Sequence, residues 1–174
     1  NLFRRVRQML DDGVAVAGPD SLMLFLGNRY DEQSFADDPS LLDRFASLDD
    51  NDVMTAVKQW QHHEDAILSR LSRNLACRHL SAIRISEHPF PTDVIEEKRY
   101  QVHERYGISL QDTDFFMGTG ILRNHAYDFN DQEIRVLYKD GSCRDISEAS
   151  DQLDRHFLEK QVTKYYFFFP KELK

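Results

Sequence analysis

The stretch FASLDDNDVMTAVKQWQHHEDAILSRLSRNLACR, residues 45–78, carries the clearest structural pattern in the chain. Val53, Val57 and Trp60 recur at spacings of four and three, which places them on one apolar stripe of a helix. A second apolar run has the same helical spacing: Ile67, Leu68, Leu71 and Leu75. The stretch therefore predicts two successive amphipathic helices.

Acidic side chains mark where these two helices begin. A short carboxylate accepts unpaired N–H groups of the first turn and suits the positive end of the helix dipole, so we expect Asp50 or Asp52 to cap the first helix. No Gly or Pro separates the helices, so the polar residues 62–65 must form the corner between them. Glu64 or Asp65 is available to cap the second helix.

Several residues in and after this stretch match a known pattern. They are Phe45, Leu48, Asp49, Asp50, Asp52 and Val53, then Lys58, Gln59 and Trp60, then Arg78, His79 and Leu80. Together they resemble the region C-terminal to the catalytic core of bacterial HD-superfamily phosphohydrolases, the group related to deoxynucleoside triphosphate triphosphohydrolases. The resemblance covers the first half of the chain in recognisable residues, and the second half only in its order of helices and strands.

The resemblance implies a metal-dependent phosphohydrolase, but not that this chain carries the metal. The metal-binding doublet of that family is His followed directly by Asp, and none of the seven histidines here is followed by Asp. We therefore expect no catalytic residue, metal ligand or cofactor in this chain. A divalent metal is expected in a separate catalytic HD domain, and the start at Asn1, inside a helical pattern, suggests a piece excised from a longer protein.

Composition narrows the class of protein. A chain of this length buries about 70% of the surface that its unfolded form exposes, enough for one sizeable core or two small ones. Thirty acidic and 22 basic residues give a formal charge of −8, which opposes loose binding to nucleic acid. Cys77 and Cys143 lack metal-ligand spacing and no apolar run could span a bilayer, so we expect a cytoplasmic protein with reduced thiols that binds neither membranes nor specific nucleic acids.

Before the central stretch, glycine and proline residues of the kind that end or begin helices predict several short helices. The first helix should end at Gly13, and a second, over residues 22–26, should end at Gly27. We expect a loop over residues 31–38, and Pro39 should begin another helix. Residues 1–78 therefore predict about five helices.

After Arg78 the pattern favours strands. An extended segment over residues 80–85 should stop at the prolines 89 and 91, and Thr92 should cap a helix that ends at Gly107. Phe115, Phe116 and Met117 should begin a second strand.

The remaining segments predict a hairpin, a helix and a final strand. Asp140-Gly141 lies between two alternating runs, a strong hairpin signal. Ser147 can cap a helix, and residues 162–169 form a strand with five consecutive aromatic residues. Successive strand side chains point to opposite faces, so this strand must be central or packed against the helical half.

These elements predict an α+β fold. We expect an N-terminal helical half packed on a small antiparallel sheet with two helices on one face. The predicted regions are residues 1–78, which are helical, and residues 79–174, which are α+β, joined without a flexible linker.

Two polar clusters invite a metal interpretation. His62 and His63 are adjacent on a helix and point about 100° apart, so they cannot chelate one ion as an i, i+4 pair would. A corner pair that bonds backbone groups is the favoured interpretation. The acidic run of residues 49–52 resembles a calcium loop but lacks the glycine and late glutamate of an EF-hand, so helix capping is favoured.

Two arginines are candidates for binding a phosphate-bearing effector. In the resembling family the segment at Arg78 continues as Arg-x-Leu-Phe-Lys, and in some relatives its Arg and Lys help to bind an activating nucleotide between subunits. Arg78 matches this pattern, whereas Ser81 and Ala82 replace the aromatic residue and the lysine. Arg73 lies on the preceding helix and is the second candidate. A structural ion pair is the alternative for both arginines.

Two functions follow from this sequence. The first is an accessory, oligomerising and regulatory region of an HD-type phosphohydrolase that acts on a nucleotide or phosphate ester. Its partners would be its own catalytic domain, further copies of itself and a nucleotide effector. The alternative is a stand-alone interaction module that docks a protein through the aromatic strand and the hairpin.

Overall fold

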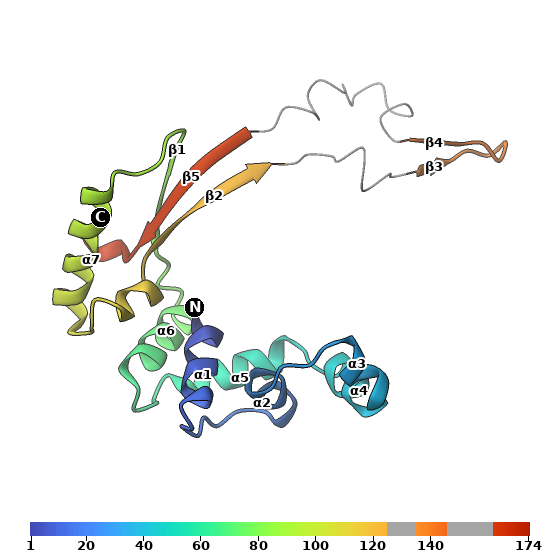
Figure 1. The fold of residues 1–174 in the computed structure, drawn as a ribbon, viewed down its shortest axis with the longest axis horizontal. Coiled ribbons are helices and arrows are strands. Elements are labelled where there is room, and N and C mark those ends of the chain that lie inside the picture. Colours follow the sequence, from blue (N-terminus) through green and yellow to red (C-terminus); the bar gives the residue numbers. More distant parts are fainter. Residues whose placement is uncertain (125–134, 146–161) are drawn as a thin grey trace. The chain divides into compact units, whose positions relative to one another are not determined.

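The computed structural model describes residues 1–124, 135–145 and 162–174 (Figure 1). The described residues form two compact units. The first contains residues 1–82, 93–118 and 168–174, and the second contains the described residues of 83–92 and 119–167. The predicted division into residues 1–78 and 79–174 stays a prediction.

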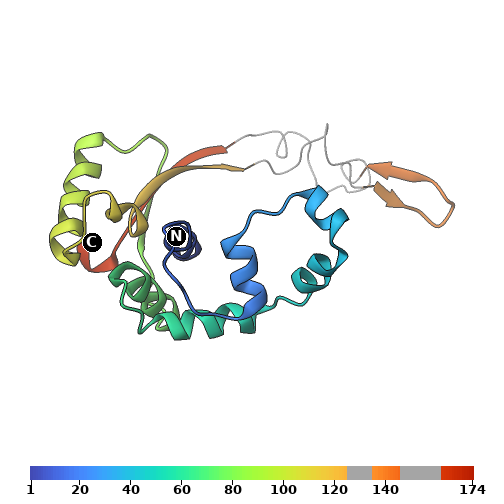
Figure 2. The same ribbon diagram turned by 60° about the horizontal axis from the view of Figure 1, so that its bottom comes forward.

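Six short helices make up the N-terminal part of the first unit. They are α1 (Leu2–Asp11), α2 (Asp20–Gly27), α3 (Glu32–Asp37), α4 (Pro39–Ala46), α5 (Asp50–Trp60) and α6 (Ala66–Ala76). Figure 2 shows α5 and α6, in teal and green, meeting at the predicted polar corner. The predicted ends of α1 at Gly13 and of α2 at Gly27 are confirmed, as is the start of α4 at Pro39.

The segment of residues 31–38 is not the loop that its polar composition suggested. It contains α3, because Asp31 accepts the backbone N–H of Ser34 while the Ser34 hydroxyl oxygen accepts the backbone N–H of Asp31. This reciprocal pair is a capping box, which satisfies two of the free N–H groups of a helix start. The prediction missed it because the box spans only four residues within an acidic run.

The cap of α5 is one residue earlier than predicted. The Asp49 carboxylate accepts the backbone N–H groups of Asn51 and Asp52 at 2.7 and 3.2 Å. Asp52 in turn accepts the N–H of Asp49, so Asp52 completes a capping box and is not itself the cap. The N-cap must have extended backbone geometry, and Asp49, with φ −136°, meets this condition. Asp65 caps α6 as predicted, through a 2.7 Å bond from the N–H of Leu68.

Trp60 lies at the centre of the helical core. It is only 1% exposed, and its indole N–H donates to the carbonyl of Ala17 at 2.6 Å. The buried side chains around it come from α1, α2, α5, α6 and the segment between α1 and α2: Val6, Met9, Val16, Leu22, Leu26, Ala56 and Leu68. From the apolar stripe that the sequence indicated, Trp60 therefore packs against α1 and α2, while Val57 is also buried and Val53 is partly buried.

The second half of the chain contains one long helix and short strands. Strand β1 (Ala82–Ser86) is followed by α7 (Thr92–Tyr106), which ends at Gly107 with a left-handed φ of +62°. Residues 115–117 do not begin a strand. The N–H groups of Phe116 and Met117 both donate to the carbonyl of Thr113, closing a tight turn after the 3₁₀ segment Asp112–Phe115, and β2 (Gly118–Asn124) begins afterwards.

The antiparallel sheet has the strand order β1-β5-β2, so the aromatic strand β5 (Val162–Phe169) is central, as predicted. Phe167 and Phe169 are fully buried. A Cβ atom at Gly120 would lie 2.5 Å from the Tyr166 ring, so the glycine leaves the space that this ring occupies. The described residues contain seven α-helices and this small sheet, which confirms the α+β class.

The predicted Asp-Gly hairpin is also confirmed. Strands β3 (Arg135–Leu137) and β4 (Cys143–Asp145) pair antiparallel, and Gly141 has a left-handed φ of +82°. The helix predicted from Ser147, which would be the second helix on the sheet face, falls outside the described residues.

Candidate functional site

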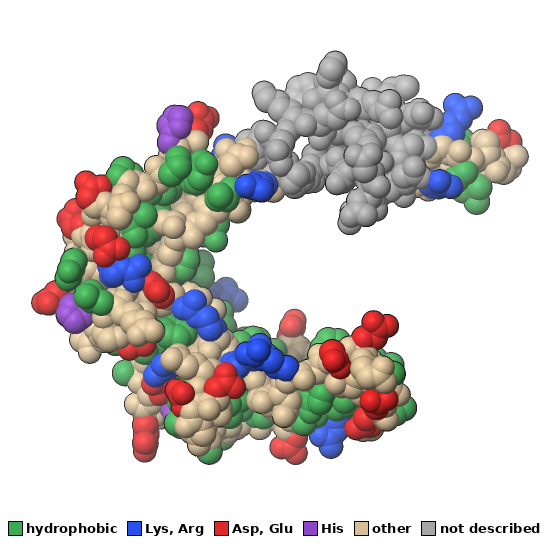
Figure 3. All heavy atoms as spheres, in the orientation of Figure 1, with side chains coloured by type: hydrophobic (Ala, Val, Ile, Leu, Met, Phe, Trp, Pro, Cys, Tyr) green, Lys and Arg blue, Asp and Glu red, His purple; other side chains and the backbone are tan. Residues whose placement is uncertain are grey.

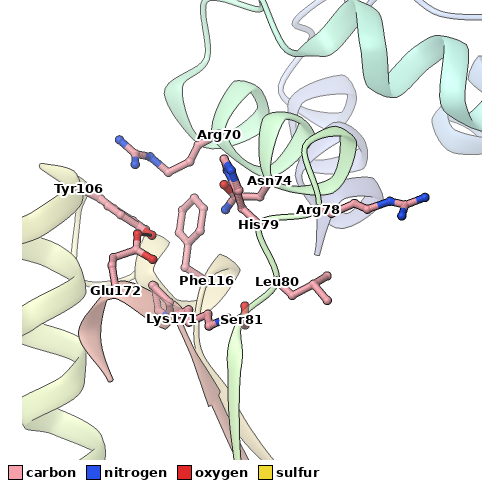
Figure 4. A pocket seen from close by; sticks show the side chains of 11 residues that line it. Arg70, Asn74, Arg78, His79, Leu80, Ser81, Tyr106, Phe116, Lys171 and Glu172 are labelled. Carbon is pink, nitrogen blue, oxygen red and sulfur yellow. Dashed lines mark hydrogen bonds between the residues drawn. The ribbon is translucent and has the colours of Figure 1, made fainter.

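A cavity of about 600 Å³ lies within the first unit, at the end of α6 (Figure 4). Three separate parts of the chain supply most of its wall: the end of α6 with the segment after it, the end of α7, and the turn that follows β5. The lining residues are Arg70, Asn74, Arg78, His79, Leu80, Ser81, Tyr106, Phe116, Pro170, Lys171 and Glu172.

Basic side chains outnumber acidic ones around this cavity. Arg70, Arg78 and Lys171 carry formal positive charges, and Glu172 is the one carboxylate among the lining residues. This local excess contrasts with the net charge of −8 for the whole chain. A cavity with such a lining favours an anionic ligand, and guanidinium and ammonium groups are the usual protein partners of phosphate.

The single carboxylate of the cavity is already engaged. The Tyr106 hydroxyl donates to Glu172 at 2.6 Å. Burial, together with this hydrogen bond, raises the pKa of the Tyr106 hydroxyl, and the same hydrogen bond lowers the pKa of the Glu172 carboxyl. The guanidinium of Arg70 lies 4.1 Å from the centre of the Tyr106 ring, a cation–π contact. Tyr106 therefore holds both Glu172 and Arg70 at the wall of the cavity.

Arg78 has an unusual backbone conformation. Its φ is +57°, and among the described residues it is the one non-glycine residue with a positive φ. It occupies the position just after the cap of α6, where the N–H groups of Arg78 and His79 donate back to Leu75 and Asn74 at 3.2 and 2.8 Å. Glycine is preferred at this position because it lacks a Cβ atom, whereas other residues there lower the stability of the fold by about 1 kcal/mol. Figure 4 shows the Arg78 side chain pointing away from Tyr106 and Phe116.

The structure does not bring the two candidate arginines together. Arg78 lines the cavity, but Arg73 is not among the lining residues. The Arg73 guanidinium instead donates to the carbonyl and hydroxyl oxygens of Ser69, one helical turn earlier, at 3.3 and 3.1 Å.

The sequence did not indicate that Tyr106, Lys171 and Glu172 line the same cavity as Arg78. Tyr106 lies at the end of α7, and Lys171 and Glu172 follow β5, so all three are far from Arg78 in sequence. No spacing pattern relates these segments, and only the folded arrangement shows that they share a cavity.

The polar corner between α5 and α6 has a backbone role. The Nδ1 atom of His63 accepts the N–H of Asp65 at 3.0 Å, which confirms for His63, though not for His62, the interpretation of a corner pair that bonds backbone groups. Within the described ranges, no group of three or more His, Cys, Asp or Glu side chains could hold a metal ion. No described helix is long and apolar enough to cross a membrane.

The chain resembles part of a solved phosphohydrolase. That protein, from Bacteroides thetaiotaomicron VPI-5482, is 35% identical to this chain, with a TM-score of 0.76. The similarity covers 95% of this chain but 41% of the solved protein, so this chain spans less than half of that length. No protein-family model matches the chain, and no curated protein matches it. The likeness supports the phosphohydrolase part of the resemblance seen in the sequence.

Proposed function

We propose that this chain is the accessory and regulatory region of a metal-dependent HD-type phosphohydrolase. The observation that carries the proposal is a 35% identical phosphohydrolase that matches 95% of this chain yet is far longer. Hydrolysis of a nucleotide or phosphate ester would be performed by a catalytic HD domain elsewhere in the protein. A divalent metal there would polarise the phosphoryl oxygen and activate water. The role of this region is to support that domain and to contribute to a subunit interface.

The cavity is the regulatory site of this proposal, and its ligand is a phosphorylated nucleotide. The family pattern after Arg78 calls for an aromatic residue and a lysine, which Ser81 and Ala82 replace. Phe116 and Lys171 line the same cavity from other elements, so an aromatic ring and an ammonium group are present although the local pattern lacks them. Arg70 adds a guanidinium group at the wall of the cavity. The Arg78 side chain points away from Tyr106 and Phe116, so its guanidinium would have to turn toward the cavity to contact a phosphate.

The catalytic part of the proposal is tested with the purified chain. We expect no hydrolysis of deoxynucleotides, guanine nucleotides or p-nitrophenyl phosphate in the presence of Mg²⁺ or Mn²⁺. Metal-dependent turnover that copurifies with the chain would show that the catalytic site is within it. The genomic sequence that encodes the residues before Asn1 gives an independent check, because the proposal requires a His-Asp doublet there.

The regulatory part is tested by calorimetric titration with deoxynucleoside and guanine triphosphates, with light scattering to measure mass. Arg78→Gln and Lys171→Gln should each weaken binding about tenfold, because each removes a charge-assisted contact to phosphate. Arg73→Gln is the matched control, since this arginine lies on α6, shortly before Arg78 in the sequence, but outside the cavity. Equal loss in the control would show that general charge, and not the cavity, determines binding.

The alternative of a docking module that uses the aromatic strand has less support from the fold. β5 is central in its sheet, and Phe167 and Phe169 are fully buried. These two side chains are part of the core of the chain and are not available to a partner.

A further inference from the structure

A second surface, separate from the cavity, is built by α2, α3 and α4. Four aromatic rings contact one another there, with centroid separations between 5.4 and 6.3 Å. We call them the aromatic cluster: Phe25, Tyr30, Phe35 and Phe45. Ring pairs at such distances are favourable beyond the apolar area that they bury, so the cluster holds these short helices together.

One side of α4, the helix that contributes Phe45 to this cluster, presents apolar side chains to solvent. Leu42 is 58% exposed and Phe45 is 56% exposed. They are three residues apart, so they lie on the same side of the helix. The Phe45 ring packs against the rings of Phe25 and Phe35, with centroids 5.4 and 6.2 Å away, so its orientation is fixed before anything binds. A side chain ordered in advance loses little conformational entropy on binding, which is typical of the residues that dominate interfaces.

The surroundings of this apolar ridge are strongly acidic. Residues 31–50 contain one basic residue, Arg44, and seven carboxylates: Asp31, Glu32, Asp37, Asp38, Asp43, Asp49 and Asp50. Figure 3 shows acidic side chains around hydrophobic ones where α3 and α4 lie. None of the seven forms an ion pair with another residue in the part of the chain that the structure describes. Asp31, Asp38 and Asp49 accept backbone N–H groups at helix starts, but no basic side chain in that part of the chain neutralises any of the seven charges.

We propose that the face formed by Leu42, Phe45 and the surrounding carboxylates docks a basic amphipathic helix of a partner protein. The apolar side of that helix would cover Leu42 and Phe45, and its Lys and Arg side chains would meet the acids. A second copy that used the same face would bring two sets of carboxylates together, which like-charge repulsion opposes. The basic helix α1 of the chain is already used, since Arg5 pairs with Asp65 and Arg7 donates to the carbonyl of Leu26.

The test uses fluorescein-labelled model peptides and the whole chain. The first peptide places Leu on one helical face and Lys on the other, the second has Glu in place of Lys, and the third is a scramble of the first. We expect anisotropy to show binding of the Leu–Lys peptide, weaker binding of its scramble, and no binding of the Leu–Glu peptide. Raising the salt concentration should weaken binding, because exposed charges are screened within about 10 Å at 0.1 M salt.

Two pairs of variants locate the site. Leu42→Ser should weaken binding about tenfold, as expected for an anchor of an interface, whereas Leu75→Ser, on the exposed side of α6, should not. Asp43→Asn should weaken binding by a smaller factor, whereas Asp11→Asn should leave it unchanged. Thermal melts monitored by circular dichroism confirm that each variant is folded. Equal binding of the three peptides, or unchanged binding to Leu42→Ser, would overturn the proposal. Light scattering that shows a dimer lost in Leu42→Ser would assign the face to a second copy instead.

Discussion

The pair of helices α5 and α6 and the cavity at the end of α6 are built in opposite ways. The helices are specified by near neighbours in sequence: Asp49 caps α5, Asp65 caps α6, and Trp60 closes the apolar stripe. The cavity is made of groups that share no local pattern, such as Arg70, Tyr106 and Lys171. Local sequence is therefore sufficient to define the two helices, whereas the cavity forms only when the fold brings distant parts of the chain together. Substitutions in one region at a time show whether the other region depends on it.

The largest effect should come from Trp60→Ala. Removal of this buried ring leaves a cavity in the core and an unpaired carbonyl at Ala17, so unfolding should become easier by about 3–5 kcal/mol. Urea denaturation followed by circular dichroism measures the change. Met54→Ala, on the partly exposed side of α5, should cost far less and is the control. Similar costs for the two variants would show that Trp60 is not the centre of the core.

Asp65 should have the next largest effect, because it has two roles. It caps α6, and it forms an ion pair with Arg5 in which both side chains are 17% exposed. Asp65→Ala loses both roles, whereas Asp65→Asn keeps a capping oxygen and loses only the charge. We expect the alanine variant to unfold more easily than the asparagine variant, by about 1 kcal/mol. Equal stability of the two variants would show that capping of α6 by Asp65 does not contribute to stability.

The pH dependence of the same pair of proteins tests the ion pair. Burial acts to raise the pKa of Asp65, but the hydrogen bonds from Arg5 and from the Leu68 N–H outweigh it, so the pKa is lowered. A lowered pKa stabilises the fold above the unfolded pKa of about 4, and this stabilisation is lost as the pH falls through the folded value. The stability difference between wild type and Asp65→Asn should therefore be full at neutral pH and disappear in acid. A difference that grows below pH 4 would contradict this.

Elements in which one residue type dictates the backbone were predictable from the sequence. Gly13, Gly107 and Gly141 end or turn the chain where expected, and all three have a positive φ. Two errors arose where a reciprocal contact decided the outcome. The capping box of Asp31 and Ser34 made a helix from an expected loop, and the one around Asp49 moved the start of α5 by one residue.

For the candidate site, the sequence indicated Arg78 but not the residues around it. Arg78 was found because it lies in a family pattern, and Arg73 was paired with it by proximity along the helix. Lys171 could not have been found in this way, since it follows the last strand and reaches the cavity only through the fold. Long-range neighbours of this kind leave no periodicity in the sequence.

Tyr106→Phe should have a smaller effect on stability. This variant tests whether the Tyr106 hydroxyl controls the ionisation of Glu172 at the wall of the cavity. Loss of the hydroxyl removes the hydrogen bond to Glu172, at a cost of about 1 kcal/mol in unfolding free energy. The pKa of Glu172 should rise, because that hydrogen bond is the main cause of its lowered value. Carboxyl ¹³C chemical shifts followed against pH measure it. An unchanged Glu172 titration would mean that the pair does not persist in solution.

The smallest expected effect on stability comes from Arg78→Gly, and it is the most informative. The ends of α1 and α6 have the same hydrogen-bonding pattern, with bonds from residues 13 and 14 to Leu10 and Met9, and from residues 78 and 79 to Leu75 and Asn74. Position 13 holds glycine at a φ of +77°, whereas position 78 holds arginine at +57°. Arg78→Gly should therefore leave the fold as stable as wild type or up to about 1 kcal/mol more stable, and more stable than Arg78→Ala. Gly13→Ala should lose stability by a similar amount, for the same steric reason.

Binding measurements show whether the Arg78 side chain has a role in ligand binding in addition to its position at the end of α6. If the arginine is retained for its side chain, both Arg78→Gly and Arg78→Ala should lose affinity for a nucleoside triphosphate, although they differ in stability. Calorimetric titration at equal protein concentration, with Arg73→Ala as the control, measures this. Full affinity in the glycine variant would show that binding does not require the arginine side chain at this strained position. A glycine variant that is stable but does not bind would mean that arginine at position 78 lowers stability but supplies a charge that binding requires. Position 13, in contrast, has only the role of ending a helix.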